Sequence, residues 1–154
     1  TITAANASSI SDGASALIMA SQEAADQHGI KPLARMLGHS TYSRHPSEFT
    51  IAPVGAIEKL MKKLEWGVND VDLFEINEAF AVVTLMAMDD LGLPHDKVNV
   101  FGGACAQGHP IGSTGSRIIA TLIHALRTKG GKRGIASLCI GGGEATAVAV
   151  ELID

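Results

Sequence analysis

Apolar residues recur along this chain at two spacings, one typical of helices and one of buried strands. The three- and four-residue spacing after Pro53 and from Ser113 to Lys129 predicts two helices that each bury one face. Their predicted core positions are Ile57, Leu60, Met61, Leu64, Ile118, Ile119, Leu122, Ile123 and Leu126. A third helix is predicted over residues 77–91, apolar around most of its circumference, and a fourth over residues 12–28, with Asp12 as its N-cap.

Five shorter apolar runs have the length of buried strands. They cover residues 33–41, 71–76, 98–101, 135–140 and 145–153. Strands and helices alternate from residue 33 onward, until Gly141-Gly142-Gly143 joins the last two strands as a hairpin. Such alternation is typical of parallel crossovers with helices on both faces of a sheet. The pattern predicts an α/β fold in three layers, α-β-α, around a mixed, mostly parallel five-stranded sheet. The helix over residues 12–28 stands outside this alternation.

Composition and charge limit the partners of this fold. The chain has 46% hydrophobic and 18% charged residues, as ordinary packed domains do. Its formal net charge of −4 offers no basic field to a nucleic acid, so no nucleic-acid partner is expected. No apolar run reaches the roughly 18 residues of a membrane span, so no membrane partner is expected.

The two cysteines, Cys105 and Cys139, are too few for a disulfide framework. Reduced thiols in a reducing compartment are therefore expected. No spacing places two plausible metal ligands on one face, so no metal site is expected either. The chain starts Thr1-Ile2-Thr3 without a methionine, and we expect it to begin inside a longer protein.

Two turns that follow predicted strands carry polar side chains suited to a site. Asn77 lies where a strand runs into a helix, the place where open α/β sheets hold ligands. Asparagine is also a common N-cap, which explains Asn77 without any function. His109 stands between Gly108 and Pro110, and the proline restricts the backbone that aims the imidazole. A surface histidine in a glycine-rich loop is the alternative.

A third turn begins at Cys139, which ends a predicted strand and opens the turn of three glycines. The N–H groups of such a turn can bind a developing oxyanion, although a cysteine is often only a small buried hydrophobe. If the strands are parallel neighbours, an amide, an imidazole and a thiol meet at one edge of the sheet. A thiol and an imidazole together transfer protons or act as nucleophile and base. The residues alone therefore indicate a Cys/His site for acyl transfer or proton abstraction.

Four segments, read in order, are similar to signature blocks of the thiolase family. They are Asn6-Ala7-Ser8 with Asp12-Gly13-Ala14, Asn77-Glu78-Ala79-Phe80-Ala81, GGACAQGHPIGSTG (residues 102–115) and Cys139-Ile140-Gly141-Gly142-Gly143. The resemblance covers the whole chain and is to the C-terminal half of the family. It implies reversible thiolysis of a 3-ketoacyl-CoA or Claisen condensation of two acyl-CoA molecules. Coenzyme A and acyl-CoA are then substrates, and no tightly bound cofactor is expected.

The resemblance also implies catalytic roles. His109 matches the histidine that activates the acylated cysteine and donates to one oxyanion hole. Asn77 matches the asparagine that positions the water of that hole. Cys139 matches the cysteine that exchanges the α-proton of the acyl-CoA, and Gly141 matches the glycine whose N–H belongs to the second hole.

The remaining matches concern substrate binding. Ser8 resembles the serine that contacts the pantetheine arm, and Phe80 and Phe49 resemble residues that line the acyl pocket. The acylated cysteine and the main contacts to the CoA phosphates belong to the N-terminal half, which this sequence lacks. Cys105 falls where the family more often has an aliphatic residue, so it does not match that cysteine.

The implied domain organisation is a thiolase-like C-terminal domain over residues 29–154, preceded by residues 1–28 as the tail of the N-terminal half and its loop region. The implied partners are the N-terminal thiolase half and further copies of the protein, in a homodimer or homotetramer. A cytoplasmic location is expected, and a mitochondrial or peroxisomal one stays open because a targeting segment would precede Thr1.

Two functional hypotheses follow. The first is an acyltransferase half-site that is inactive as this fragment alone. The second is a catalytically inactive, truncated module that binds acyl-CoA or only dimerises. Ketoacyl synthases share the fold but use a cysteine with two histidines, and the sterol-carrier type of thiolase usually has a histidine in the block that contains Asn77. Asn77 and Cys139 therefore favour the acyl-CoA thiolases.

Overall fold

The last strand of the chain lies in the middle of the sheet. The computed structural model describes residues 1–153, so Asp154 lies outside the described residues, and it contains a four-stranded sheet in the order β1-β4-β3-β2. The strands are β1 (Ala34–Ser43), β2 (Leu73–Ile76), β3 (Arg133–Cys139) and β4 (Glu144–Leu152). β4 pairs antiparallel with β1 and β3, while β2 and β3 pair parallel. The mixed α/β sheet and the C-terminal hairpin are thus confirmed.

Strand direction and strand pairing differ in this sheet. β1, β2 and β3 run in one direction and β4 runs against them, so the directions are mostly parallel as predicted. The pairings are not: within residues 1–153, β2–β3 is the only parallel pair, because β4 separates β1 from β3. Ala145, Ala147 and Ala149 of β4 are buried beneath α2 (Ala52–Leu64), where their small side chains leave room for the helix.

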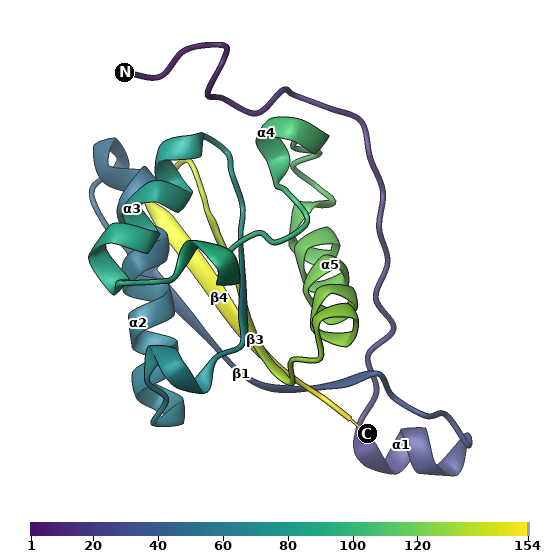
Figure 1. Cartoon of the computed structure of the whole chain (residues 1–154). Coiled ribbons are helices and arrows are strands. Elements are labelled where there is room, and N and C mark those ends of the chain that lie inside the picture. The colour runs from purple at the N-terminus through teal and green to yellow at the C-terminus, as the bar shows by residue number, and fades with distance from the viewer. Residues whose placement is uncertain (154) are drawn as a thin grey trace.

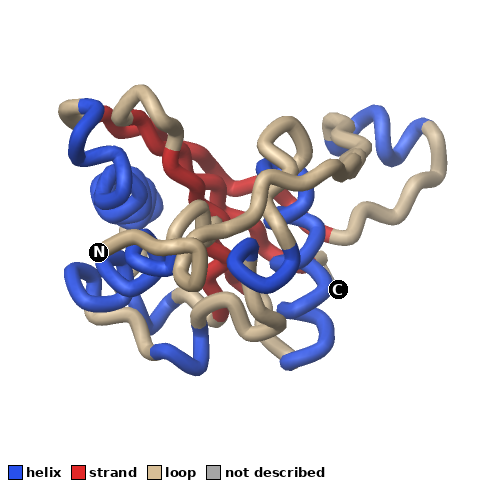
Figure 2. Tube along the Cα trace, turned by 90° about the horizontal axis from the view of Figure 1, so that it is seen from above, coloured by secondary structure: helices blue, strands red, loops and turns tan. Residues whose placement is uncertain are grey.

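Helices cover both faces of the sheet (Figure 1). α2 and α3 (Ala81–Leu91) lie against one face and α5 (Thr114–Lys129) lies against the other, which confirms the three predicted layers. Seen from above, the strands run between these helices (Figure 2). Most predicted core positions are buried, namely Ile57, Leu60, Met61, Ile118, Leu122 and Leu126. Leu64, Ile119 and Ile123 are half-buried at the margins of the two apolar clusters.

The remaining helices are short. α1 (Gln22–Gln27) has six residues and α4 (Ala104–Gln107) has four, and the 3-10 helices cover Pro46–Ile51, Val68–Asp70 and His95–Lys97. None of the helices in the described part of the chain has the length and apolar character needed to cross a membrane.

The strand predicted over residues 98–101 is wrong, and with it the fifth strand. Val98 makes a single parallel bridge to Phe74 before the chain turns away. Asn99 causes the turn, with a φ of +47° and a side chain that binds the backbone of Ile76. Its Oδ1 accepts from the Ile76 N–H and its Nδ2 donates to the Ile76 carbonyl, both at 2.8 Å. A side-chain amide thus takes the hydrogen bonds that a fifth strand would make with β2.

The helix predicted over residues 12–28 is wrong for most of its length, because only α1 forms. Residues 11–20 contain neither helix nor strand and run along α5 (Figure 1). Ser15 Oγ donates to the Ser113 carbonyl at 2.9 Å, beside the start of α5. This contact with another element overrides the local helical pattern, whose apolar residue Ile18 stays 96% exposed.

The helix predicted from Asn77 begins four residues later, at Ala81. The residues before it pair with the N-terminal segment, through an antiparallel bridge between Ala7 and Phe80. Asn77 itself continues β2, because its N–H donates to the Ser137 carbonyl of β3 at 2.9 Å. Asn77 is therefore not a helix N-cap, and the capping explanation for it is excluded.

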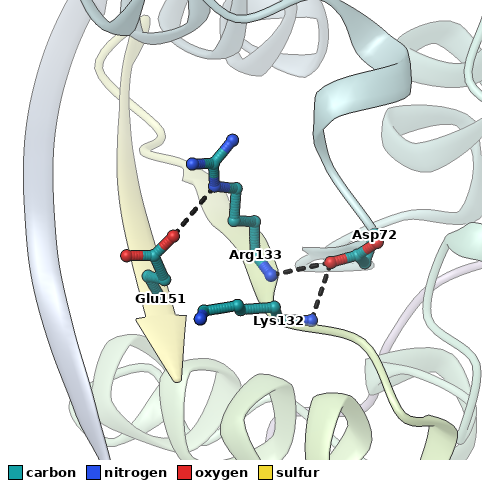
Figure 3. Close-up of polar contacts among 4 residues, drawn as sticks. All are labelled: Asp72, Lys132, Arg133 and Glu151. Carbon is teal, nitrogen blue, oxygen red and sulfur yellow. Dashed lines mark hydrogen bonds and ion pairs between the residues drawn. The ribbon is translucent and has the colours of Figure 1, made fainter. Parts of the chain in front are cut away.

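A polar cluster closes the end of the sheet where β2 and β3 begin (Figure 3). Asp72 Oδ2 accepts from the backbone N–H groups of Lys132 at 2.7 Å and Arg133 at 2.8 Å. Arg133 Nε donates to Glu151 Oε1 of β4 at 2.9 Å, and its guanidinium lies 5.1 Å from the centre of the Trp66 ring. The Asp72 carboxylate thus joins the starts of β2 and β3 and helps to set the register in which these two parallel strands pair.

Candidate active site

Two loops and the N-terminal segment meet where β2 and β3 end. The loop after β2 begins with Asn77, and α4 leads into the turn that holds His109. The N-terminal segment crosses this edge at the top of Figure 1 and contacts both loops. The Ser8 N–H donates to the Ala79 carbonyl at 3.1 Å. The His109 N–H donates to the Ser9 carbonyl at 2.9 Å. This segment therefore holds the two loops at a defined spacing.

Gly108 allows the turn that holds His109, which the sequence places between a glycine and a proline. Gly108 has a φ of +93°, and a side chain there would overlap Ser11. The half-buried imidazole makes two polar contacts. Its Nδ1 lies 2.7 Å from Thr114 Oγ1, and its Nε2 lies 3.4 Å from Asn77 Nδ2. The ring is held on both sides, so His109 is not an incidental surface histidine.

The Asn77 side chain lies on the α5 side of the sheet and is only 1% exposed. Its Oδ1 accepts from Arg117 Nη2 of α5 at 3.3 Å, which leaves Nδ2 directed at His109. The predicted amide and imidazole are thus brought together at the edge of the sheet.

Burial and one cation determine the charge of this cluster. Burial, and then the positive charge of Arg117, lower the pKa of His109, which favours a neutral imidazole near pH 7. Glu75 lies two residues before Asn77 on β2 and is 2% exposed. Its burial raises the pKa of Glu75 to about 7, an effect that Arg117 opposes and Glu78 reinforces. Within residues 1–153, Glu75 Oε1 has no hydrogen-bond partner.

Cys139 ends β3 at the same edge of the sheet but on the opposite face. Its side chain packs in the apolar cluster with Ile76 beneath α2 and α3, whereas Asn77 faces α5. Burial raises the pKa of the Cys139 thiol, which therefore holds its proton at neutral pH. In the described chain no hydrogen bond joins Cys139 to Asn77 or His109. The thiol and the imidazole thus lie at the same edge of the sheet, as predicted, without a hydrogen bond between them in residues 1–153.

Gly141 lies exposed in the turn between β3 and β4. Hydrogen bonds from the Ile140 N–H to the Glu144 carbonyl and from the Gly143 N–H to the Ile140 carbonyl, at 2.7 and 3.0 Å, close this turn. Among the residues described, the Gly141 N–H has no partner, and a Cβ added to Gly141 would meet no atom within 4 Å. The structure therefore offers a free amide beside open space.

The three predicted binding residues lie around the loop after β2. Ser8 Oγ donates to the Ala79 carbonyl at 2.9 Å, so its oxygen remains free to accept. Phe49, from the 3-10 helix Pro46–Ile51, contacts Phe80 edge to face, with ring centroids 5.9 Å apart. Both rings are half-buried. The structure thus brings Ser8 and the aromatic pair to the same loop.

Sequence reasoning missed Thr114, Arg117 and Glu75. A usable signal existed for Glu75, because a charged residue inside the short apolar strand Leu-Phe-Glu-Ile is rare without a partner or a function. Thr114 and Arg117 stand three positions apart, hence on one face of a helix. Only the fold shows that this face meets Asn77. The described residues contain no group of three or more histidine, cysteine, aspartate or glutamate side chains that could hold a metal ion.

Comparison with known sequences gives one family. The model of the thiolase C-terminal domain matches residues 30–152. The chain is 50% identical to an acetyl-CoA acetyltransferase of Chromobacterium violaceum over 151 residues, which are 98% of this chain and 38% of that protein. The cytosolic acetyl-CoA acetyltransferase of Mus musculus is 47% identical, with the same two shares covered.

Comparison with solved structures agrees. The acetyl-CoA acetyltransferase of Bacillus anthracis superposes with a TM-score of 0.95 at 45% identity, over 99% of this chain and 39% of that one. Human mitochondrial 3-ketoacyl-CoA thiolase in complex with CoA gives 0.96 at 47% identity, over 99% of this chain and 38% of that one. The chain spans less than two fifths of the length of these relatives. Sequence and fold coincide over nearly all of the chain, which belongs to the thiolase family and contains its C-terminal domain.

Proposed function

We propose that this chain supplies His109, Asn77, Cys139 and Gly141 to the active site of an acyl-CoA C-acyltransferase. The reaction is reversible thiolysis of a 3-ketoacyl-CoA or Claisen condensation of acyl-CoA, and the acylated cysteine comes from an N-terminal thiolase half. The contact between Asn77 Nδ2 and His109 Nε2 carries the proposal, because it joins two of the predicted residues at the ligand-binding edge of the sheet.

The first half-reaction acylates the cysteine of the N-terminal half. His109 accepts that thiol's proton, the thiolate attacks the keto carbon, and the carbon–carbon bond breaks. The Cys139 thiol then protonates the enolate, releasing acetyl-CoA and leaving the acyl group on the attacking cysteine. A raised thiol pKa suits Cys139 to hold the proton that this step needs.

The second half-reaction returns each group to its starting state. The thiol of CoA gives its proton to the Cys139 thiolate and attacks the acyl-cysteine. The released cysteine thiolate recovers its proton from His109. Negative charge develops on a thioester oxygen in both halves, and preorganised N–H donors lower such barriers strongly. The free Gly141 amide supports a role as one of these donors.

Substrate and partners follow from the same proposal. Ser8 accepts a hydrogen bond from the pantetheine arm of CoA, and Phe49 and Phe80 line the acyl pocket. No tightly bound cofactor is needed, and the CoA bound to human mitochondrial 3-ketoacyl-CoA thiolase supports CoA as the substrate here.

Residues 29–154 form the C-terminal domain, and residues 1–28 belong to the tail of the N-terminal half. Ile10 and Ile18, which are 94% and 96% exposed, are suited to contact that half or another copy of a homodimer or homotetramer. Relatives include cytosolic and mitochondrial proteins, and we propose a cytoplasmic location.

The alternative is a truncated module that binds acyl-CoA or only dimerises. The chain's own thiols favour this reading, because neither is suited to be the acylated nucleophile. Burial first, and then the charge of Glu78, raise the pKa of Cys105. A nucleophilic cysteine needs a lowered pKa.

The deciding experiment measures CoA-dependent cleavage of acetoacetyl-CoA. It compares this chain alone with the product of its extended reading frame, each with His109→Ala and with His124→Ala, an exposed histidine of α5, as the matched control. Activity only in the extended protein, lost in His109→Ala and kept in His124→Ala, supports the acyltransferase. Acyl-CoA binding without cleavage in either form supports the binding module.

A further inference from the structure

Four hydrogen bonds run in one direction through the cluster beside α5. They link Arg117, Asn77, His109, Thr114 and the carbonyl of Pro110. Each link has a donor and an acceptor whose identities constrain the next link. The position of the proton on the His109 ring can therefore be worked out from either end of this series of hydrogen bonds.

The first end starts at Arg117, whose guanidinium only donates. The Asn77 atom that it contacts at 3.3 Å must therefore be the carbonyl oxygen, Oδ1. The amide orientation follows, and Nδ2, which also only donates, is the atom that faces His109 Nε2 at 3.4 Å. His109 Nε2 must then be the acceptor, without a proton.

The second end starts at Pro110, whose carbonyl accepts the Thr114 hydroxyl proton at 3.0 Å. With its single proton directed to this carbonyl, Thr114 Oγ1 accepts from His109 Nδ1, which lies 2.7 Å away. His109 Nδ1 must then carry the proton. Both ends give the same tautomer, and the tautomer of a histidine is set by the hydrogen bond that its other nitrogen makes.

The surroundings favour this arrangement. Thr114 and Arg117 lie on one face of the first turn of α5, and Thr114 and Asn77 are almost completely buried, so water does not compete for their hydrogen bonds. Glu75 is the carboxyl whose charge couples to Arg117 from β2. A misaligned Asn77 or Thr114 would leave a buried donor or acceptor unpaired, which is unfavourable.

We propose that Thr114 and Arg117 are positioning residues that hold His109 in the Nδ1–H tautomer, so that Nε2 is the unprotonated nitrogen and takes the proton when the group that the site deprotonates replaces the Asn77 amide at this nitrogen. Thr114 acts directly on Nδ1, and Arg117 acts through the orientation of the Asn77 amide. The catalytic consequence rests on the proposed function, whereas the tautomer itself does not.

The first test is nitrogen-15 NMR of the labelled 154-residue chain, using the two-bond correlations of histidine side chains. The ring-nitrogen shifts distinguish a protonated nitrogen from a bare one, and His109→Gln assigns the signal among the six histidines. A bare Nε2 and a protonated Nδ1 are expected in the unmodified chain and in Thr114→Ser. Thr114→Val, which keeps the shape and removes the hydroxyl, is expected to give a mixture with the Nε2–H form. A protonated Nε2 in the unmodified chain overturns the proposal, as does an unchanged tautomer in a folded Thr114→Val. If Thr114→Val does not fold, the unmodified chain and Arg117→Met provide the same test.

The second test measures thiolysis by the extended protein. Thr114→Val is expected to lower kcat by roughly tenfold to a hundredfold with KM changed less than about twofold, because a positioned base contributes about 10²–10⁴ in rate. Thr114→Ser is expected to recover most of kcat. An unchanged kcat in Thr114→Val overturns the catalytic role. If the tautomer is as stated but the extended protein cleaves no acyl-CoA, the proposed function fails and the positioning of His109 stands.

Discussion

The rings of Phe49 and Phe80 meet edge to face, with 67° between their planes and 5.9 Å between their centroids. This contact joins the 3-10 helix before α2 to the residue that precedes α3. It ties together two segments that are about thirty positions apart and both border the candidate site.

The Phe49–Phe80 contact is expected to stabilise the chain measurably. Phe49→Leu, Phe80→Leu and the double variant should give a coupling energy of about 0.5–1.5 kcal/mol in a double-mutant cycle, because edge-to-face aromatic pairs contribute this much beyond their buried area. Urea unfolding of the four chains measures it. Phe101→Leu, an exposed phenylalanine, is the control and should not couple to Phe80. Additive single substitutions would contradict a specific ring contact.

Two glycines of the turn after Cys139 are expected to respond differently to alanine. Gly141→Ala should change the free energy of unfolding by less than about 0.5 kcal/mol, because its Cβ would meet open space. Gly143→Ala should destabilise by at least about 2 kcal/mol, because Gly143 has a φ of +104° and its Cβ would overlap the Arg44 carbonyl. Thermal and urea unfolding measure both.

Catalytic activity, unlike stability, is expected to be sensitive to Gly141→Ala. In the extended protein, Gly141→Ala is expected to lower kcat by about tenfold or more while the protein stays folded, because its methyl group would stand beside the amide proposed to bind the oxyanion. Full activity in Gly141→Ala would remove Gly141 from the proposed oxyanion hole.

Asp72 is expected to contribute strongly to stability from the far end of the sheet. Asp72→Ala removes the acceptor of the Lys132 and Arg133 N–H groups and should destabilise by about 1.5–3 kcal/mol. Asp72→Asn keeps one side-chain oxygen and should lose less. Asp90→Ala, at an exposed position of α3, should stay within about 0.5 kcal/mol. Equal stability of the Ala variants at positions 72 and 90 would show that the carboxylate does not hold the strands together.

Glu75 predicts a specific pH dependence. Its folded pKa of about 7 lies above the ordinary 4.5, so the folded chain holds a proton that the unfolded chain releases between these values. The contribution of Glu75 to the free energy of unfolding therefore falls by a total of about 3 kcal/mol as pH rises from about 4.5 to 7. Above that range it is constant. The lowered pKa of His109 gives the opposite slope.

Comparison with Glu75→Gln isolates this effect. Urea unfolding of both chains at several pH values between 5 and 8 should show a stability difference that shifts in favour of Glu75→Gln as pH rises. A difference that does not change with pH would mean that Glu75 is ionised in the folded chain at pH 5.

The fold could be predicted where the apolar spacing of an element also decides its packing. α2, α5 and the hairpin of β3 and β4 are such elements, because each buries the face that its own sequence defines. Two predicted elements did not form because one of their own polar side chains binds another part of the fold. Asn99 uses its amide to end a strand after Val98, and Ser15 anchors to Ser113 a segment with a helical pattern.

The candidate site divides in the same way. His109 and Asn77 were predicted because a Gly-His-Pro turn and an asparagine at a strand end have local physical consequences. Thr114 and Arg117 could not be predicted from spacing, because their roles depend on Asn77, forty positions from Arg117, lying against the start of α5. Contacts of this kind exist only after the sheet has formed.

The central position of β4 determines when the sheet can form during synthesis. Among the strands described in residues 1–153, β1 is made first, yet it pairs only with β4, whose residues 144–152 leave the ribosome after the other three strands. Until then β1 has no partner strand, and β3 lacks one of its two neighbours. The sheet therefore closes after nearly all of these residues have been translated, and a nascent chain stopped before Glu144 would expose β1 to chaperones or to pairing with other chains.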